Sequence, residues 1–70
     1  MRDFRTIIKV LKEYVSDGSL EKVYDKEIAA LLDISQAQFA TIKKRNTTPY
    51  PQIIRFCKEE GISCCDIFFD

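Results

Sequence analysis

The chain has 70 residues and no net formal charge, with 46% hydrophobic and 31% charged residues. This length fits one domain, which we expect to span residues 1–70, and it is too short for a large enzyme pocket. The composition is typical of a folded chain and not of a disordered one. Zero net charge argues against a protein that coats nucleic acid of any sequence.

No cofactor, metal site or catalytic group is predicted. The chain has no histidine and no Cys-x-x-Cys pair, and its three cysteines (Cys57, Cys64 and Cys65) are a poor disulfide framework. It also lacks a Gly-rich phosphate loop and a recognisable acid pair, so we do not expect an enzyme. The first ten residues lack the apolar run of a signal peptide, which predicts a cytoplasmic protein with reduced thiols. Cys57 is interpreted as a small buried hydrophobe.

A first helix is predicted from Phe4 onward, with Asp3 as its N-cap and Gly18 as its stop. Its apolar residues recur at helical spacing: Phe4, Ile7, Ile8, Leu11, Tyr14 and Val15. Residues 19–24 form a loop or a single turn, from which Leu20 and Val23 can reach the core.

Residues 25–45 predict two short helices joined by a tight turn. Asp25 is expected to cap the first of them, with Glu27 in its first turn. Two apolar faces at helical spacing flank an interruption at residues 33–35: Ile28, Ala29 and Leu32, then Phe39 and Ile42. Ala29 is expected where the helices approach closely, and Ile34 in the wedge between them. This pattern predicts a helix-turn-helix.

The second motif helix has defined ends at about residues 35 and 45. Ser35 is its N-cap, and Gln38 completes a capping box. Basic residues occupy the last turn, and Asn46 can take a left-handed conformation before Pro49.

The outward side of this helix is polar, small and free of acid, and consists of Gln36, Ala37, Ala40, Thr41 and Lys44. Such a face suits the major groove, because Gln can bond adenine, small methyl groups can contact thymine, and Lys can reach guanine or phosphate. The alternative is a helical bundle whose solvated face happens to have this composition.

The charges are unevenly distributed along the chain. Residues 34–58 carry five basic groups and no acidic ones, whereas residues 59–70 carry four acidic groups. An acid-free window at the presumed DNA-binding helix fits a local phosphate footprint. Five cations neutralise few phosphates, so strong binding is expected to require two copies or an added domain.

A helix is predicted after Asn46, with Pro51 in its first turn, Ile53, Ile54 and Cys57 on its buried side, and Gly61 at its end. Polar residues gather at its start, where they can serve as caps, hold a DNA phosphate or do both: Thr47, Thr48, Tyr50 and Gln52.

Ser63 and Asp66 predict the start of a final helical turn. Adjacent Phe68 and Phe69 cannot both face one core, so one is expected to emerge. An emerging aromatic suggests a homodimer contact through Ile67, Phe68 and Phe69, or continuation into a second domain. A frayed terminus is the alternative.

Three segments, KEIAALLDIS, FATIKKRNTTPY and IIRFCKEEGISCCDIFF, resemble the helix-turn-helix domain of phage CI-type repressors, within the lambda-repressor-like fold. The resemblance covers about residues 4–69 and implies an all-α, five-helix domain whose third helix enters the major groove of a double-stranded DNA operator, usually as a dimer. By motif position, the residues implied to contact bases are Gln36, Ala37, Thr41 and Lys44. Those implied to lie near phosphates are Lys43, Arg45, Asn46 and Thr48.

The chain departs from the family in two respects. Asp33 stands where the family commonly has Gly, and Asp accepts a left-handed backbone less readily, at a cost of about 1 kcal/mol. Such repressors often carry a C-terminal oligomerisation or autopeptidase domain that this sequence lacks, so we expect a stand-alone regulator or a fragment. The competing function is a protein-interaction module that keeps the fold without binding DNA.

Overall fold

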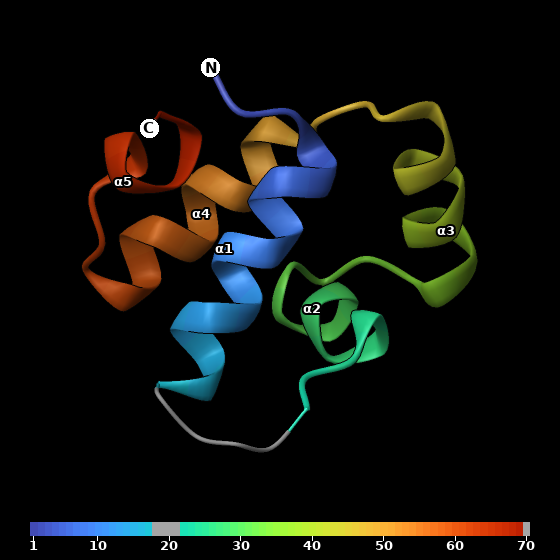
Figure 1. Ribbon diagram of the computed structural model, residues 1–70, viewed down its shortest axis with the longest axis horizontal. Helices are drawn as coiled ribbons and strands as arrows, with labels where there is room; N and C mark the ends of the chain where they lie inside the picture. Colours follow the sequence, from blue (N-terminus) through green and yellow to red (C-terminus); the bar gives the residue numbers. More distant parts are fainter. Residues whose placement is uncertain (18–21, 70) are drawn as a thin grey trace.

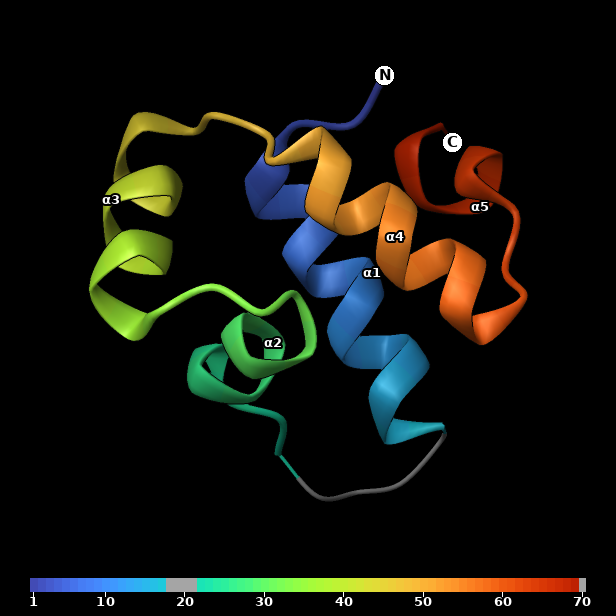
Figure 2. The same ribbon diagram turned by 180° about the vertical axis from the view of Figure 1, so that it is seen from behind.

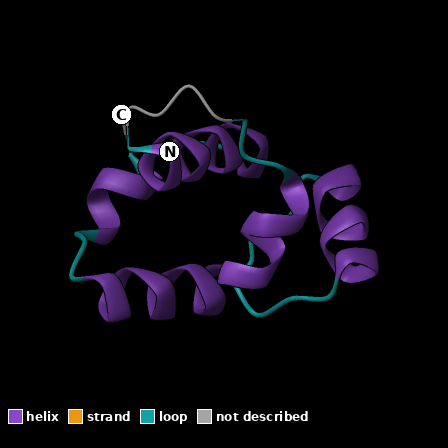
Figure 3. Ribbon diagram, turned by 90° about the horizontal axis from the view of Figure 1, so that it is seen from below, coloured by secondary structure: helices purple, strands orange, loops and turns teal. Residues whose placement is uncertain are grey.

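Five α-helices follow one another in the computed structural model, which describes residues 1–17 and 22–69. They are α1 (Phe4–Ser16), α2 (Asp25–Leu31), α3 (Gln36–Arg45), α4 (Tyr50–Glu60) and α5 (Cys64–Phe68) (Figure 1). These two ranges contain helices and loops and no strand (Figure 3). The predicted all-α, five-helix fold is confirmed.

The core lies between α1 and α4, which overlap in Figure 1 and run along opposite sides of the molecule in Figure 3, with α2 and α3 toward one end and α5 toward the other (Figures 1, 2 and 3). All five helices contribute apolar side chains to it. Fully burying one large apolar side chain stabilises a fold by about 1.5–3 kcal/mol. The buried hydrophobic residues are Phe4, Ile7, Ile8, Leu11, Ile28, Ala29, Leu32, Ile34, Phe39, Ile53, Phe56, Cys57, Ile67 and Phe68.

The start of α1 is as predicted, and its end lies one residue earlier than the predicted stop. The Asp3 carboxylate accepts a hydrogen bond of 2.9 Å from the Thr6 N–H, which satisfies one of the free donors at the helix start. The helix ends at Ser16, and its C-cap is Asp17, whose φ of 47° is left-handed and whose N–H donates to the Glu13 carbonyl. Gly18 lies outside the described residues.

The apolar stripe of α1 is buried only along its first two turns. Tyr14 and Val15, predicted as core residues, are 44% and 39% exposed, because the last turn of α1 projects beyond its neighbours. Tyr14 still contacts Phe56 edge-on, with ring centroids 6.1 Å apart. Val23 packs against the core as predicted, and Leu20 lies outside the described residues.

In α4, the predicted Pro51 in the first turn and the stop at Gly61, with φ 70°, are both confirmed. The predicted buried side is partly wrong. Ile54 is 47% exposed and Phe56 takes the inward position, because helical spacing from Ile53 places residue 56 over the core and residue 54 about 100° away.

The two ends of the described chain meet at α5 (Figure 1). The Arg2 N–H donates to the Phe68 carbonyl at 2.8 Å, and the Arg2 guanidinium donates to the Asp66 carbonyl at 2.8 Å. Ser63 is the N-cap residue, but its side chain forms no capping bond, so that part of the prediction is wrong. As predicted, one of the two terminal aromatics emerges: Phe68 is buried and Phe69 is 50% exposed.

The three cysteines are free thiols in different environments. Cys57 is fully buried, Cys64 is half-buried and Cys65 is exposed. Burial raises the pKa of the Cys57 thiol to about 11, assisted by a hydrogen bond with Cys64. The interpretation of Cys57 as a small buried hydrophobe is confirmed.

Candidate nucleic-acid interface

The motif helix α2 begins one residue earlier than the sequence suggested. Tyr24 is its N-cap, and the Glu27 carboxylate accepts a hydrogen bond of 2.7 Å from the Tyr24 N–H. The prediction that Asp25 caps this helix is therefore wrong. Asp25 is its first residue, and its side chain is free to point toward α1 and α3.

The turn between α2 and α3 closes with a Schellman motif. The Ile34 N–H donates to the Ala29 carbonyl at 2.9 Å, and the Asp33 N–H donates to the Ala30 carbonyl at 3.1 Å. Asp33 has a φ of 57°, the left-handed conformation that was expected to be costly for Asp at this position. Ala29 and Ile34 are both buried at this junction, as the pattern predicted.

Arg55 of α4 stabilises the same turn. Its guanidinium donates to the Leu32 carbonyl at 3.1 Å and lies 3.7 Å from the Asp33 carboxylate. The hydrogen bond satisfies one of the carbonyls left free at the end of α2. The unusual residue in the turn therefore has an external partner.

The inward face of α3 fixes the helix against the core. Ser35 is the N-cap, as predicted, and its hydroxyl accepts a hydrogen bond of 3.1 Å from the Gln38 N–H. The second bond of the predicted capping box, from the Ser35 N–H to the Gln38 side chain, is not formed. Phe39 is buried and contacts Phe4 of α1 edge-on, with ring centroids 5.6 Å apart. Ile42 packs against the core from the next turn.

The far end of α3 is held to the start of α1. Asn46 has a φ of 55°, and the Thr47 N–H donates to the Ile42 carbonyl at 3.1 Å, so this end is again a Schellman motif. The Asn46 side-chain oxygen accepts from the Arg5 N–H at 3.4 Å, and its amide donates to the Asp3 carboxylate at 3.4 Å.

The outward face of α3 is solvent-exposed along its whole length. It holds Gln36, Ala37, Ala40, Thr41 and Lys44. The Thr41 hydroxyl donates to the Ala37 carbonyl at 3.1 Å, and this bond within the helix fixes the orientation of the Thr41 side chain, including its methyl group. The four residues expected to contact bases therefore share one accessible surface, on a helix whose two ends are fixed.

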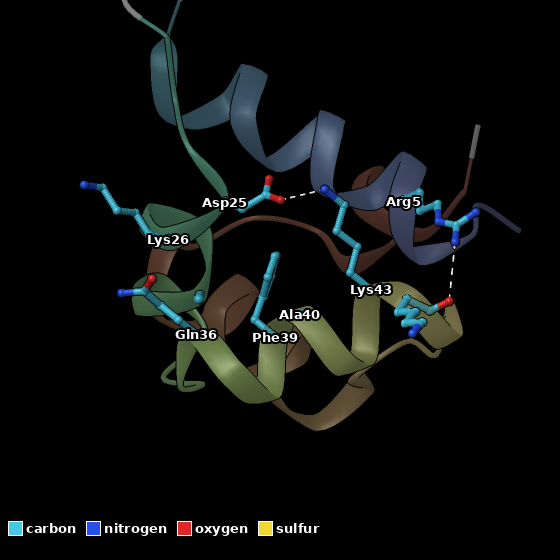
Figure 4. Close-up of a pocket in the computed structure, with 9 residues that line it drawn as sticks. Arg5, Asp25, Lys26, Gln36, Phe39, Ala40 and Lys43 are labelled. Carbon is cyan, nitrogen blue, oxygen red and sulfur yellow. Dashed lines mark hydrogen bonds and ion pairs between the residues drawn. The ribbon is translucent and has the colours of Figure 1, made fainter.

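A groove of about 510 Å³ runs beside this face, between α3 and the starts of α1 and α2 (Figure 4). We call it the basic groove, because four cationic side chains and one acidic side chain line it. Its lining residues are Arg5, Asp25, Lys26, Ala29, Gln36, Phe39, Ala40, Lys43 and Lys44. Three residues belong to both the groove and the outward face of α3: Gln36, Ala40 and Lys44.

The acidic member of the groove, Asp25, binds two lysines from two other helices. Its Oδ2 accepts a hydrogen bond of 2.6 Å from Lys43 of α3. Its Oδ1 forms an ion pair with Lys12 of α1, whose Nζ lies 2.6 Å away. Lys12 first and Lys43 second hold the pKa of Asp25 below its ordinary value, against the effect of burial.

The four residues expected near phosphates do not share one environment. Lys43 is engaged by Asp25, and Asn46 is engaged by α1. Arg45 is exposed in the last turn of α3, and Thr48 is half-buried in the following loop, where its carbonyl accepts from the Tyr50 N–H at 3.0 Å.

The fold brings to this surface cations that the sequence pattern did not indicate. The Arg5 guanidinium donates to the Lys44 carbonyl at 3.4 Å and lines the groove from α1 (Figure 4). Lys26 lines the groove from α2, and Lys22 and Lys26 lie 5.4 and 6.0 Å from the centre of the exposed Tyr24 ring. No periodicity within α3 could have revealed them.

Residues 22–69 match the family model described as the bacteriophage CI repressor helix-turn-helix domain. That family consists of DNA-binding repressor domains and is not a class of enzymes. No curated protein and no solved structure matches the chain. Within the described part of the chain, the helices are too short or too polar to cross a membrane.

Proposed function

Because the chain belongs to the bacteriophage CI repressor helix-turn-helix family, we propose that it binds double-stranded DNA sequence-specifically as a phage-type transcriptional repressor. In this proposal, residues 1–70 act as one cytoplasmic DNA-binding domain and α3 enters the major groove. The observation that supports it is the exposed, acid-free face of α3 beside the basic groove. An α-helix fits the major groove, and cations at its flank neutralise the adjoining phosphates.

The proposed base contacts come from Gln36, Ala37, Thr41 and Lys44. Gln36 is the first residue of α3, so its amide extends beyond the helix end, where it can bond adenine bidentately. Ala37 and the Thr41 methyl suit thymine methyl groups, and Lys44 suits guanine.

The proposed phosphate contacts are Lys43, Arg45, Asn46 and Thr48, to which the structure leads us to add Arg5 and Lys26. Arg5 and Lys26 lie at opposite ends of the basic groove, so they can hold the DNA backbone near the two ends of α3 (Figure 4). Phosphate contacts of this kind set the register of a protein on the duplex without reading its sequence.

We further propose that the chain binds a two-fold operator as a homodimer through its C-terminal segment. Of the three residues expected there, Ile67 and Phe68 are buried and pack the core, so Phe69 is the one that can reach a partner. Two further exposed residues, Met1 and Tyr50, lie near the end of α5: the Tyr50 ring is 5.3 Å from that of Phe68, and the Tyr50 hydroxyl is 3.8 Å from the Met1 sulfur. A dimer doubles the number of phosphates that are neutralised. One copy has five cations in residues 34–58, so we expect strong binding to need this doubling.

The experiment is selection of bound duplexes from a random pool, followed by anisotropy titration of the selected sequence between about 50 and about 200 mM salt. A palindromic consensus bound with strong salt dependence is expected. Arg45→Gln should weaken binding to all duplexes alike, because it removes a phosphate contact.

Failure to enrich any sequence, together with no salt-dependent binding to mixed genomic fragments, would refute DNA binding. It would favour a protein-interaction module, the alternative suggested by the zero net charge and the exposed Phe69.

A further inference from the structure

Asp25 is the one acidic side chain that lines the basic groove among the residues described. Its carboxylate lies between lysines of two helices, 2.6 Å from Lys12 Nζ and 2.6 Å from Lys43 Nζ (Figure 4 shows the second pair). A DNA phosphate approaching this part of the groove therefore meets a lysine that already has an anionic partner.

The carboxylate is not required to cap α2. The Tyr24 N–H at the start of that helix is bonded by Glu27, at 2.7 Å. The side chains of Lys43 and Asp25 are 41% and 36% exposed, so their ion pair lies at the surface, where water and salt screen it. Another anion held at the same place can replace the carboxylate.

We propose that Asp25 is an internal counter-ion that competes with DNA phosphate for Lys43 and so weakens binding to DNA that lacks the operator. This inference rests on the proposed DNA binding. On random DNA, α3 is not seated in register, no phosphate is held at Lys43, and the lysine keeps its carboxylate. On an operator, base contacts fix α3 and hold one phosphate at Lys43, which displaces Asp25. The exchange adds to the discrimination between operator and random DNA.

The test uses the full chain, a short random-sequence duplex and anisotropy titrations over a range of salt. In Asp25→Asn, Lys43 is released and gains a phosphate, so the slope of log affinity against log salt should steepen by about 0.9. The loss of affinity between about 50 and about 200 mM salt should then be about 3.5-fold larger than for the natural chain.

Asp33→Asn is the matched control. It removes the same charge from the turn after α2, outside the basic groove, and Asn tolerates the φ of 57° found there. Its slope should equal that of the natural chain. Adding Lys43→Gln to Asp25→Asn should abolish the steepening, because the lysine that is released is then missing.

Single cation variants test the inference even where Asp25→Asn does not fold. On the random duplex, Lys43→Gln should leave the slope unchanged, whereas Arg45→Gln, which removes an exposed cation assigned to phosphate, should lower it by about 0.9. If Lys43→Gln lowers the slope as much as Arg45→Gln, or if Asp25→Asn and Asp33→Asn behave alike, Asp25 does not withhold Lys43, although DNA binding stands. Absence of salt-dependent binding by the natural chain overturns both proposals.

Discussion

The two faces of α3 belong to one ten-residue helix and differ in what holds them. The inward face is built from Phe39 and Ile42, which pack against α1 and the core. The outward face makes no contact with the core, and its Thr41 bonds only within the helix. Folding therefore constrains one face tightly and leaves the other free to vary with the sequence that is bound. Substitutions on the two faces should affect different measurements.

The largest effect is expected from Phe39→Ala on the inward face. Removing a buried aromatic leaves a cavity and costs about 3–5 kcal/mol, which is a large part of the stability of a small domain. Chemical unfolding followed by circular dichroism measures the change. Thr41→Ala, on the other face of the same helix, is the control, and a similar loss in both variants would contradict the division between the faces.

On the outward face, Gln36→Ala should leave the free energy of unfolding within about 0.5 kcal/mol of the natural chain. It should remove about 1–3 kcal/mol of preference for one base at one position of the selected operator, because a bidentate contact is lost. Competition titrations against operators altered at single positions measure this. A uniform weakening over all altered operators would instead assign Gln36 to the backbone.

The end of α3 joins the two faces, and Asn46 is the residue to change there. Asn46→Ala places alanine at φ 55°, where its methyl side chain cannot form a hydrogen bond that offsets the left-handed backbone. It also removes the Asn46 bonds to Arg5 and Asp3. The left-handed conformation alone costs about 1–2 kcal/mol for an L-residue. Asn46→Gly removes the bonds and keeps the backbone conformation, so the difference between the two variants in thermal unfolding isolates the backbone cost. Equal losses would show that the side-chain bonds carry all of the effect.

The smallest effect concerns two acids that tie the edges of α3 to α1. The pKa of Asp3 is lowered by its bonds from Thr6, and that of Asp25 by Lys12 and Lys43. Both folded pKa values lie below the unfolded value of about 3.9, so their contribution is complete above that pH and is lost as pH falls through the folded pKa values. The melting temperature should decline below about pH 4, and Asp25→Asn should flatten that decline. Parallel profiles for the variant and the natural chain would contradict it.

The local parts of this domain could be predicted from sequence because their signals are local. Ser35 and Asn46 mark the two ends of α3 through hydrogen bonds between residues three to five positions apart in the chain, and Gly61 marks the end of α4 in the same way. The left-handed conformation that was expected to be costly for Asp33 is also present in the structure, at φ 57°. The buried length of each apolar stripe was harder to predict, since spacing identifies a stripe and not the length over which a neighbour covers it, as the exposed Tyr14 and Val15 at the end of α1 show.

The basic groove could not be predicted because it joins residues distant in the chain. Arg5 reaches Lys44 across 39 positions, and Asp25 reaches Lys43 across 18. A helical wheel of α3 shows Lys43 and Lys44 as similar cations. In the fold, Lys43 has an anionic partner in Asp25, whereas the charge of Lys44 remains in the groove. The assignment of bases and phosphates to individual side chains remains a prediction.

Labelling of buried Cys57 can report how often the core of the folded chain opens. A thiol with no exposed surface and a pKa of about 11 cannot react with an alkylating reagent until α4 separates from its neighbours. Exposed Cys65 reacts without that delay and supplies an internal reference. The ratio of the two labelling rates, read by mass spectrometry, reports how often the core opens and whether bound DNA holds it shut, with no introduced probe.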